Sequence, residues 1–108
     1  MTKRTATLVR LRPECVDAYV EFHQHVWPDL EAVYHAAGMT DVCCYVSGTT
    51  LVVTVEVDPE IYDTARAALA GNPVERAWQS EMVELRDPGF APVVLDEVYR
   101  LPKGPEVS

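Results

Sequence analysis

The sequence predicts an α+β fold in which helices cover one face of an antiparallel sheet. Apolar and β-branched runs alternate with helical patterns in the order strand, helix, strand, strand, helix, strand. A glycine-containing turn separates the two central runs, which is typical of a β-hairpin. The 108 residues, 48% of them hydrophobic, suffice for one core and are too few for two. We therefore expect one domain over 1–108 with the ferredoxin-like split βαβ arrangement.

The first part of the chain predicts one strand and two helical segments. Residues 5–11 collect small, β-branched and aliphatic side chains, and a proline then ends this strand and opens a helix. We expect the helix over 13–26, because Pro28 disfavours helical geometry at the residue before it. A second segment, 29–37, should end at Gly38, since glycine readily adopts the positive φ of a helix C-cap.

The middle of the chain predicts a β-hairpin. Residues 40–46 and 50–57 are apolar, β-branched runs, and Gly48 between them can supply the positive φ of a tight turn. Alternation along the second run sends two sets of side chains to opposite faces, namely Leu51, Val53, Val55 and Val57 to one and Val52, Thr54 and Glu56 to the other. The mixed second face suits a partner subunit better than water alone, so we expect a homodimer joined sheet to sheet.

The last part predicts two helices and a strand. Asp58 followed by a proline is a helix cap with proline in the first turn, and predicts a helix to about residue 70. A second helix is expected over 73–85. Residues 87–92 are rich in proline and glycine and should form a loop, whereas 93–101 should form the final strand. The remaining residues, 103–108, are expected to be a flexible tail.

Charge and composition exclude several classes of partner. The net charge of −8, from nine basic and seventeen acidic residues, should repel nucleic acid and anionic membrane surfaces. The chain has no apolar run of about eighteen residues, and its N-terminus lacks the apolar core of a signal peptide. Cys15, Cys43 and Cys44 lack the spacing of a zinc or redox motif. We expect a soluble cytoplasmic protein with reduced thiols and no bound metal.

The first helix distinguishes two histidines. On a wheel of about 100° per residue, His23 lies in the apolar arc with Tyr19 and Trp27, whereas His25 lies on the polar side. An imidazole can accept and return a proton near neutral pH, and aromatic neighbours suit a small-molecule ring. The alternative, which is the commoner role of such a residue, is a core histidine hydrogen-bonded to a backbone carbonyl. The residues alone leave both interpretations open.

The helix over 73–85 contributes two further candidates. Its wheel gathers an apolar arc made of Val74, Ala77, Trp78, Met82 and Leu85. Glu81 falls within this arc, where it is either a second acid–base group with a raised pKa or a side chain that extends to the helix edge. Trp78 is either ordinary core or a surface on which a sugar stacks.

The segment at 23–30 supplies a family resemblance. Its sequence, HQHVWPDL, resembles the H-x-x-I/V-W-P-E/D-L segment of the L-rhamnose mutarotase family, and Tyr19 before it matches as well. The likeness continues through Tyr45, 55–57, Trp78 and 95–99, and so covers nearly all of the chain up to Pro102. The fold implied by the resemblance is the dimeric α/β barrel, in agreement with the predicted element order.

The resemblance also implies a reaction and a set of site residues. The reaction is the interconversion of the α and β anomers of a deoxy-hexose. Its catalytic histidine falls on His23, and its substrate contacts fall on Tyr19 and Trp78, with Glu81 as a further substrate-binding candidate. Ring opening requires one proton to leave the anomeric hydroxyl and one to reach the ring oxygen, which His23 can manage by alternating with water or Tyr19. No metal, nucleotide or other cofactor is implied.

Three departures from the family pattern bear on the sugar. Gln79 stands where a second tryptophan is usual, Glu81 where an aromatic residue or histidine is usual, and Val42 where a tyrosine is common. The pocket is therefore expected to be more polar, and L-fucose is an alternative to L-rhamnose because hydroxyl contacts decide such choices. The same barrel also hosts cofactor-free monooxygenases and non-catalytic ligand-binding proteins, which fold alone does not separate from a mutarotase.

Overall fold

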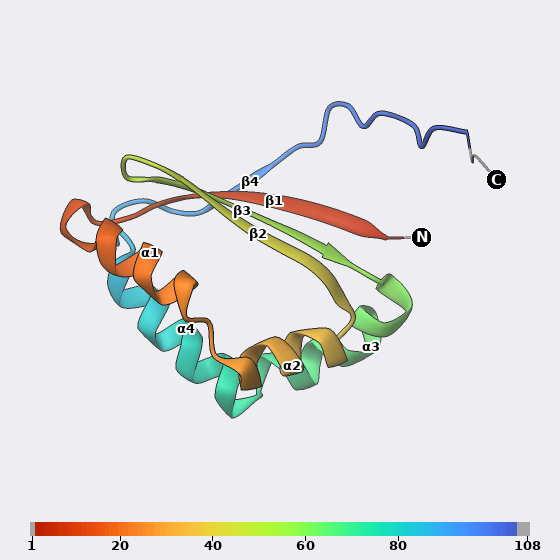
Figure 1. The fold of residues 1–108 in the computed structure, drawn as a ribbon, viewed down its shortest axis with the longest axis horizontal. Helices are drawn as coiled ribbons and strands as arrows, with labels where there is room; N and C mark the ends of the chain where they lie inside the picture. Colours follow the sequence, from red (N-terminus) through yellow and green to blue (C-terminus); the bar gives the residue numbers. More distant parts are fainter. Residues whose placement is uncertain (1, 106–108) are drawn as a thin grey trace.

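The computed structural model describes residues 2–105. Its elements are β1 (Lys3–Arg10), a 3-10 turn η1 (Pro13–Cys15), α1 (Val16–Gln24), α2 (Pro28–Ala36), β2 (Met39–Ser47), β3 (Thr50–Val57), α3 (Pro59–Ala70), α4 (Pro73–Leu85) and β4 (Val93–Leu95). The strands form one antiparallel sheet in the order β2-β3-β1-β4. The helices lie together on one side of this sheet (Figure 1). The predicted α+β split βαβ fold is thereby confirmed.

The core lies between the sheet and the helices. On β3, Leu51 and Val57 are buried and Val53 packs against the core, as the alternation of that strand predicted. Opposite them, the helices contribute the buried side chains Tyr19, Leu30, Trp78, Met82 and Leu85. Because apolar burial is the main favourable term in folding, this layer fixes how α1 and α4 sit on the sheet.

Local signals place most element ends where they were predicted. Gly48, with φ of 58°, makes the turn of the β2–β3 hairpin. Gly38, with φ of 85°, follows α2, and a Cβ there would lie 2.8 Å from the Cβ of Ile61. Asp58 caps α3, since its side chain accepts a hydrogen bond from the Glu60 backbone N–H at 3.0 Å.

The first predicted helix is shorter than expected. It begins as the 3-10 turn η1 and its α-helical part ends at Gln24 instead of residue 26. Trp27, with φ of −64° and ψ of 126°, has the extended geometry that a residue before proline prefers. The chain leaves the helix already at His25, whose φ is −136°. Pro28 then begins α2, because proline suits the first turn of a helix.

The prediction of a strand over 93–101 is wrong beyond Leu95. β4 pairs with β1 only from Ala6 to Leu8, and the following residues find no neighbouring strand in the described chain. Apolar alternation indicates a tendency to be extended, but a strand also needs a hydrogen-bonding neighbour. The side chains of Val98, Tyr99 and Leu101 are therefore exposed. Of the predicted tail, 103–105 form no helix or strand, and 106–108 lie outside the described residues.

Three further observations concern cysteines, metals and membranes. Cys15, Cys43 and Cys44 are free and half-buried. Within residues 2–105, no group of three His, Cys, Asp or Glu side chains is arranged to hold a metal ion. In the same part of the chain, no helix combines the length and the apolar character that crossing a membrane requires.

Candidate functional site

His23 lies at the end of α1 with one ring nitrogen committed to the backbone. Its Nδ1–H donates a hydrogen bond to the carbonyl of Tyr19, one turn earlier, at 2.8 Å. A carbonyl can only accept, so in the neutral ring the proton is on Nδ1 and Nε2 is the unprotonated nitrogen. The side chain is half-buried. It therefore makes the carbonyl bond of a core histidine and still presents Nε2 as a potential base.

Two aromatic side chains enclose His23. The Tyr19 ring stacks on the imidazole with 4.1 Å between ring centroids and an interplanar angle of 27°. The Trp78 ring, from α4, meets the imidazole nearly edge to face at 5.3 Å and 77°. Tyr19 is 3% exposed and Trp78 is 5% exposed, so packing holds both rings in place. The structure thus brings together the three residues that two separate helical wheels singled out.

Trp27 supports this cluster from the junction of α1 and α2. Its ring contacts Trp78 edge to face at 5.1 Å, and Phe22 contacts the same indole at 5.9 Å. The break in the helix before Pro28 is what turns Trp27 back toward α4. Such edge-to-face pairs add to the free energy of burial, and here they restrict the position of Trp78 beside His23.

The hydroxyl of Tyr19 remains protonated at neutral pH. Burial raises its pKa above the ordinary value, and the neighbouring Cys44 thiol on β2 raises it further, whereas the positive charge of Arg86 acts in the opposite direction. A phenol with a raised pKa keeps its proton at neutral pH, so it provides no phenolate base but can donate a hydrogen bond. In a reaction at this site, the proton-accepting role consequently falls to the imidazole.

Glu81 does not join this cluster, which agrees with the alternative of a side chain that extends to the helix edge and not with a buried acid–base group. Its side chain is exposed, whereas Trp78 and Met82 on the same helix are buried. The wheel included Glu81 because Ala77 counted as an apolar member, but Ala77 is exposed. Without Ala77, the last apolar residue on that side of the wheel is Val74, at about 40° from Trp78. Glu81 is at about 60° from Trp78 in the same direction and so lies outside the apolar arc.

A polar network that was not predicted links α2 to α4. The Tyr34 hydroxyl donates a hydrogen bond to Glu75 Oε2, and Gln79 Nε2 donates to Glu75 Oε1 at 3.0 Å. Burial raises the pKa of Tyr34, and the bond to Glu75 raises it further. Tyr34 and Cys44 pack against the core cluster that contains Tyr19, and Cys44 raises the pKa of both tyrosine hydroxyls.

The sequence contained part of the signal for this network. Tyr34 follows the buried Leu30 by one turn, and Glu75 and Gln79 are four residues apart on one face of α4. The missing information was where α2 meets α4, which depends on how the two helices pack.

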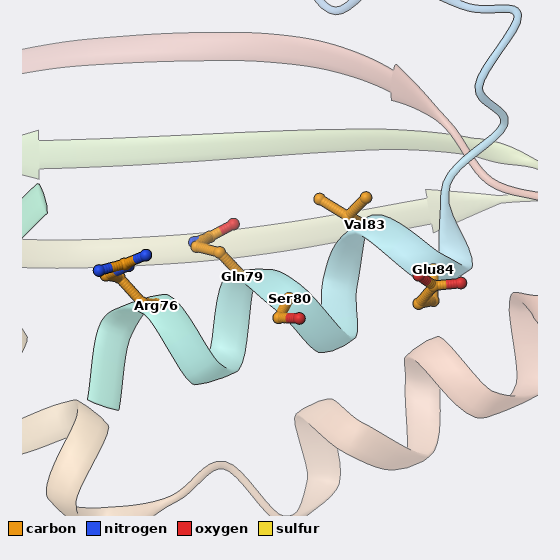
Figure 2. Close-up of a pocket in the computed structure, with 5 residues that line it drawn as sticks. All are labelled: Arg76, Gln79, Ser80, Val83 and Glu84. Carbon is orange, nitrogen blue, oxygen red and sulfur yellow. The ribbon is translucent and has the colours of Figure 1, made fainter. Parts of the chain in front are cut away.

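Two shallow pockets lie on the surface of the helices. The first has a volume of about 400 Å³ and is lined by Arg76, Gln79, Ser80, Val83 and Glu84 of α4 (Figure 2). The second has a volume of about 450 Å³ and is lined by Ala18, Glu21, Phe22, His25 and Trp27. Phe22 and Trp27, which line the second pocket, contact the Trp78 ring, whereas the residues that line the first lie on the other side of α4 from Trp78. His23 and Tyr19 line neither pocket.

Sequence comparison identifies relatives along most of the chain. The family model for L-rhamnose mutarotase matches residues 4–101. The L-rhamnose mutarotase of Klebsiella pneumoniae is 32% identical over 105 residues, which cover 91% of this chain and 97% of that protein. The L-rhamnose mutarotase of Agrobacterium fabrum is 30% identical over 89 residues, which cover 78% of this chain and 81% of that protein.

Solved structures share the fold. The L-rhamnose mutarotase of Formosa agariphila superposes with a TM-score of 0.72 at 24% identity, covering 93% of this chain and 99% of that one. Rv0793 of Mycobacterium tuberculosis superposes with a TM-score of 0.57 at 18% identity, covering 94% and 100%. At these identities the superpositions support the fold, whereas the family match and the sequence relatives decide membership. The chain therefore belongs to the L-rhamnose mutarotase family of enzymes, which interconvert carbohydrate anomers.

Proposed function

We propose that this enzyme interconverts the α and β anomers of L-rhamnose or a closely related deoxy-hexose, with His23 as its acid–base group. The observation that supports this role is the 2.8 Å hydrogen bond from His23 Nδ1 to the Tyr19 carbonyl, because it leaves Nε2 to exchange a proton with the sugar. Family membership supports the class of substrate.

The proposed reaction opens and closes the sugar ring. His23 Nε2 takes the proton of the anomeric hydroxyl while the ring oxygen receives a proton, and the bond between the anomeric carbon and the ring oxygen breaks. The open-chain aldehyde rotates, and the reverse transfers close the ring on the other face. His23 Nε2 passes the proton that it has taken to the ring oxygen, while the Tyr19 hydroxyl, which keeps its own proton because its pKa is raised, donates a hydrogen bond to that oxygen directly or through a water. Sugars mutarotate unaided, so an acceleration of about 10² to 10⁴ is sufficient.

Tyr19 and Trp78 are the proposed substrate-binding residues. Trp78 is 5% exposed, so only a small part of its ring could contact the sugar. Its larger contribution is to hold the His23 ring in place, with 5.3 Å between the two ring centroids. Tyr19 stacks on the other side of the imidazole and points its hydroxyl toward β2. Glu81 is exposed and receives no role.

Anomer-exchange NMR on the wild-type enzyme tests the activity. Saturation transfer between the α and β signals would be recorded for L-rhamnose, L-fucose and other deoxy-hexoses, with and without the protein. We expect exchange above the spontaneous rate for at least one of these sugars. If every sugar in the panel exchanged at its spontaneous rate, the proposed activity would be wrong and a non-catalytic ligand-binding role would replace it.

We further propose that two copies associate through the sheet. Strand register aligns Tyr45, Val52, Leu8 and Val93 in a row across the sheet, on the face away from Leu51 and the helices. Tyr45 is 60% exposed and Val93 is 45% exposed. The helices of the described chain lie on the opposite face (Figure 1). An apolar row left open on a sheet is typical of an association surface, and a second copy would cover it.

A charge in the middle of this row should separate the copies. Val52→Glu would bury a carboxylate opposite apolar side chains, so we expect the mass in solution to fall from twice 12.0 kDa to that of one chain. Size-exclusion chromatography with light scattering measures this mass. Val83→Glu is the matched control, because Val83 is 58% exposed but lies on α4. A wild-type mass of 12.0 kDa would contradict the proposal.

We also propose a cytoplasmic location. The support for it is that Cys15, Cys43 and Cys44 are all free. Unpaired thiols in this number suit a reducing compartment, since secreted domains of this size commonly use cysteines in disulfides.

A further inference from the structure

An isolated bridge joins the residue after β1 to the end of α4. Leu11 pairs with Arg86 in antiparallel orientation. Beside this pair, the Arg12 N–H donates to the Leu85 carbonyl at 3.0 Å. Residues that lie opposite each other in an antiparallel pair direct their side chains to the same face. Leu11 is fully buried, in the core cluster that also contains Tyr19. The side chain of Arg86 is therefore directed toward the core between the sheet and the helices.

Arg86 has no partner of opposite charge among residues 2–105. Its side chain is half-buried, its guanidinium forms no ion pair there, and its Nε is buried without a hydrogen-bond acceptor. The adjacent carboxylate, that of Asp87, accepts instead from the Gly89 N–H at 2.8 Å, and Glu84 is exposed. A guanidinium keeps its charge in proteins and has five N–H donors. A buried donor without an acceptor costs free energy, which a ligand with an acceptor group would offset.

The charge of Arg86 acts on the hydroxyl that we propose to face the ring oxygen of the sugar. Burial and the Cys44 thiol raise the pKa of the Tyr19 hydroxyl, whereas the positive charge of Arg86 lowers it. The ring oxygen joins the anomeric carbon to the ring carbon that carries the exocyclic carbon. In the proposed reaction His23 is at the anomeric hydroxyl and Tyr19 is at the ring oxygen. The exocyclic carbon, on the other side of that oxygen, is therefore the part of the sugar that would meet Arg86.

We propose that Arg86 pairs with a carboxylate on the exocyclic carbon of the sugar, and that the enzyme also interconverts the anomers of hexuronates. The inference rests on the proposed function, because it adds a class of substrate to the same reaction at the same site. In a hexuronate the exocyclic carbon is a carboxylate, whereas in L-rhamnose it is a methyl group. Arginine binds a carboxylate with two parallel N–H bonds, and Nε can supply one of them. The substrate would thus provide the acceptor that Nε lacks in the protein alone.

Anomer-exchange NMR on hexuronates and their methyl esters tests this pairing, because each acid and its ester share a ring and differ by one charge. The panel is D-galacturonate, D-glucuronate and L-guluronate. We expect the wild type to exchange at least one acid with a kcat/KM about tenfold or more above that of its ester. Arg86→Met should lower kcat/KM for this acid by about 10- to 100-fold and for the ester by less than about twofold. Arg86→Lys keeps the charge without the paired donors, so it should restore part of the loss.

Arg12 provides the matched control. Its Nε is also buried without a partner among residues 2–105, but Arg12 follows Leu11 in extended geometry, so its side chain points to the other face. Arg12→Met should leave the acid-to-ester ratio of kcat/KM unchanged. This ratio is independent of the amount of folded protein, so it separates recognition from folding. Exchange of deoxy-hexoses without exchange of any hexuronate, or an unchanged ratio in Arg86→Met, would overturn the inference alone. A wild type that exchanges no sugar would overturn the proposed function as well.

Discussion

Replacing His23 by alanine should lower the enzymatic anomer-exchange rate constant by about 100- to 10,000-fold and leave the fold intact. Among residues 2–105 the imidazole makes a single hydrogen bond, from Nδ1 to the Tyr19 carbonyl at 2.8 Å, so the substitution removes one half-buried hydrogen bond from the structure. Nε2, which we propose to move the proton, is removed at the same time. Saturation-transfer NMR on the preferred sugar measures the rate, and circular dichroism checks the fold.

His25 provides a matched control for this change. It also donates from Nδ1 to the carbonyl four residues earlier, that of Glu21, at 3.3 Å, but its side chain is exposed and lies on the other side of the helix. His25→Ala should therefore keep the wild-type exchange rate. If exchange persisted in His23→Ala at the wild-type level, the assignment of the acid–base group to His23 would be wrong whatever the control did.

The starts of the helices could be predicted because their signals are local. A proline lies in the first turn of η1, α2, α3 and α4, and the prolines of η1, α3 and α4 marked the predicted starts of these helices, whereas Pro28 was taken only as the end of the helix before α2. Proline fixes its own φ and lacks an N–H, so it favours the same place in a helix whatever surrounds it. The alternation of β3 was equally informative, since burial of Leu51 follows from a period of two.

The end of β4 could not be predicted because it depends on a neighbour. Val98, Tyr99 and Leu101 have the composition of a strand, but strand order places β4 at the edge of the sheet. Beyond Leu95 the chain pairs with no other described strand, and a sequence pattern contains no information on where pairing stops.

In the candidate site, too, some features could be predicted from local sequence patterns and others depend on tertiary packing. Tyr19 and His23 are four residues apart on one helix, so their stacking follows from helical geometry, and the position of Trp78 follows from a strongly apolar arc. Glu81 lies just beyond the edge of the same apolar arc, and whether the arc includes it depends on whether Ala77 is counted as buried. The bond between Tyr34 and Glu75 joins two helices, so it depends on tertiary packing that no single-helix pattern describes.

Replacing Trp78 by alanine should lower the free energy of unfolding by about 3–5 kcal/mol. The indole is 5% exposed and contacts Phe22, His23 and Trp27, so its removal opens a cavity that borders the proposed site. Single domains are stable by about 5–15 kcal/mol, so this loss is a large part of the total. Urea denaturation followed by the fluorescence of Trp27, the other tryptophan of the chain, measures it.

Met82 separates stability from activity in this experiment. It is 2% exposed and lies one turn after Trp78 on the same face of α4, so Met82→Ala should cost a comparable 2–5 kcal/mol. No aromatic contact joins it to His23 within the described chain. We therefore expect Met82→Ala to exchange anomers at the wild-type rate per folded molecule. Trp78→Phe should be more stable than Met82→Ala but should exchange anomers more slowly per folded molecule. Equal rates per folded molecule in the two variants would mean that Trp78 contributes only core packing and that His23 needs no support from α4.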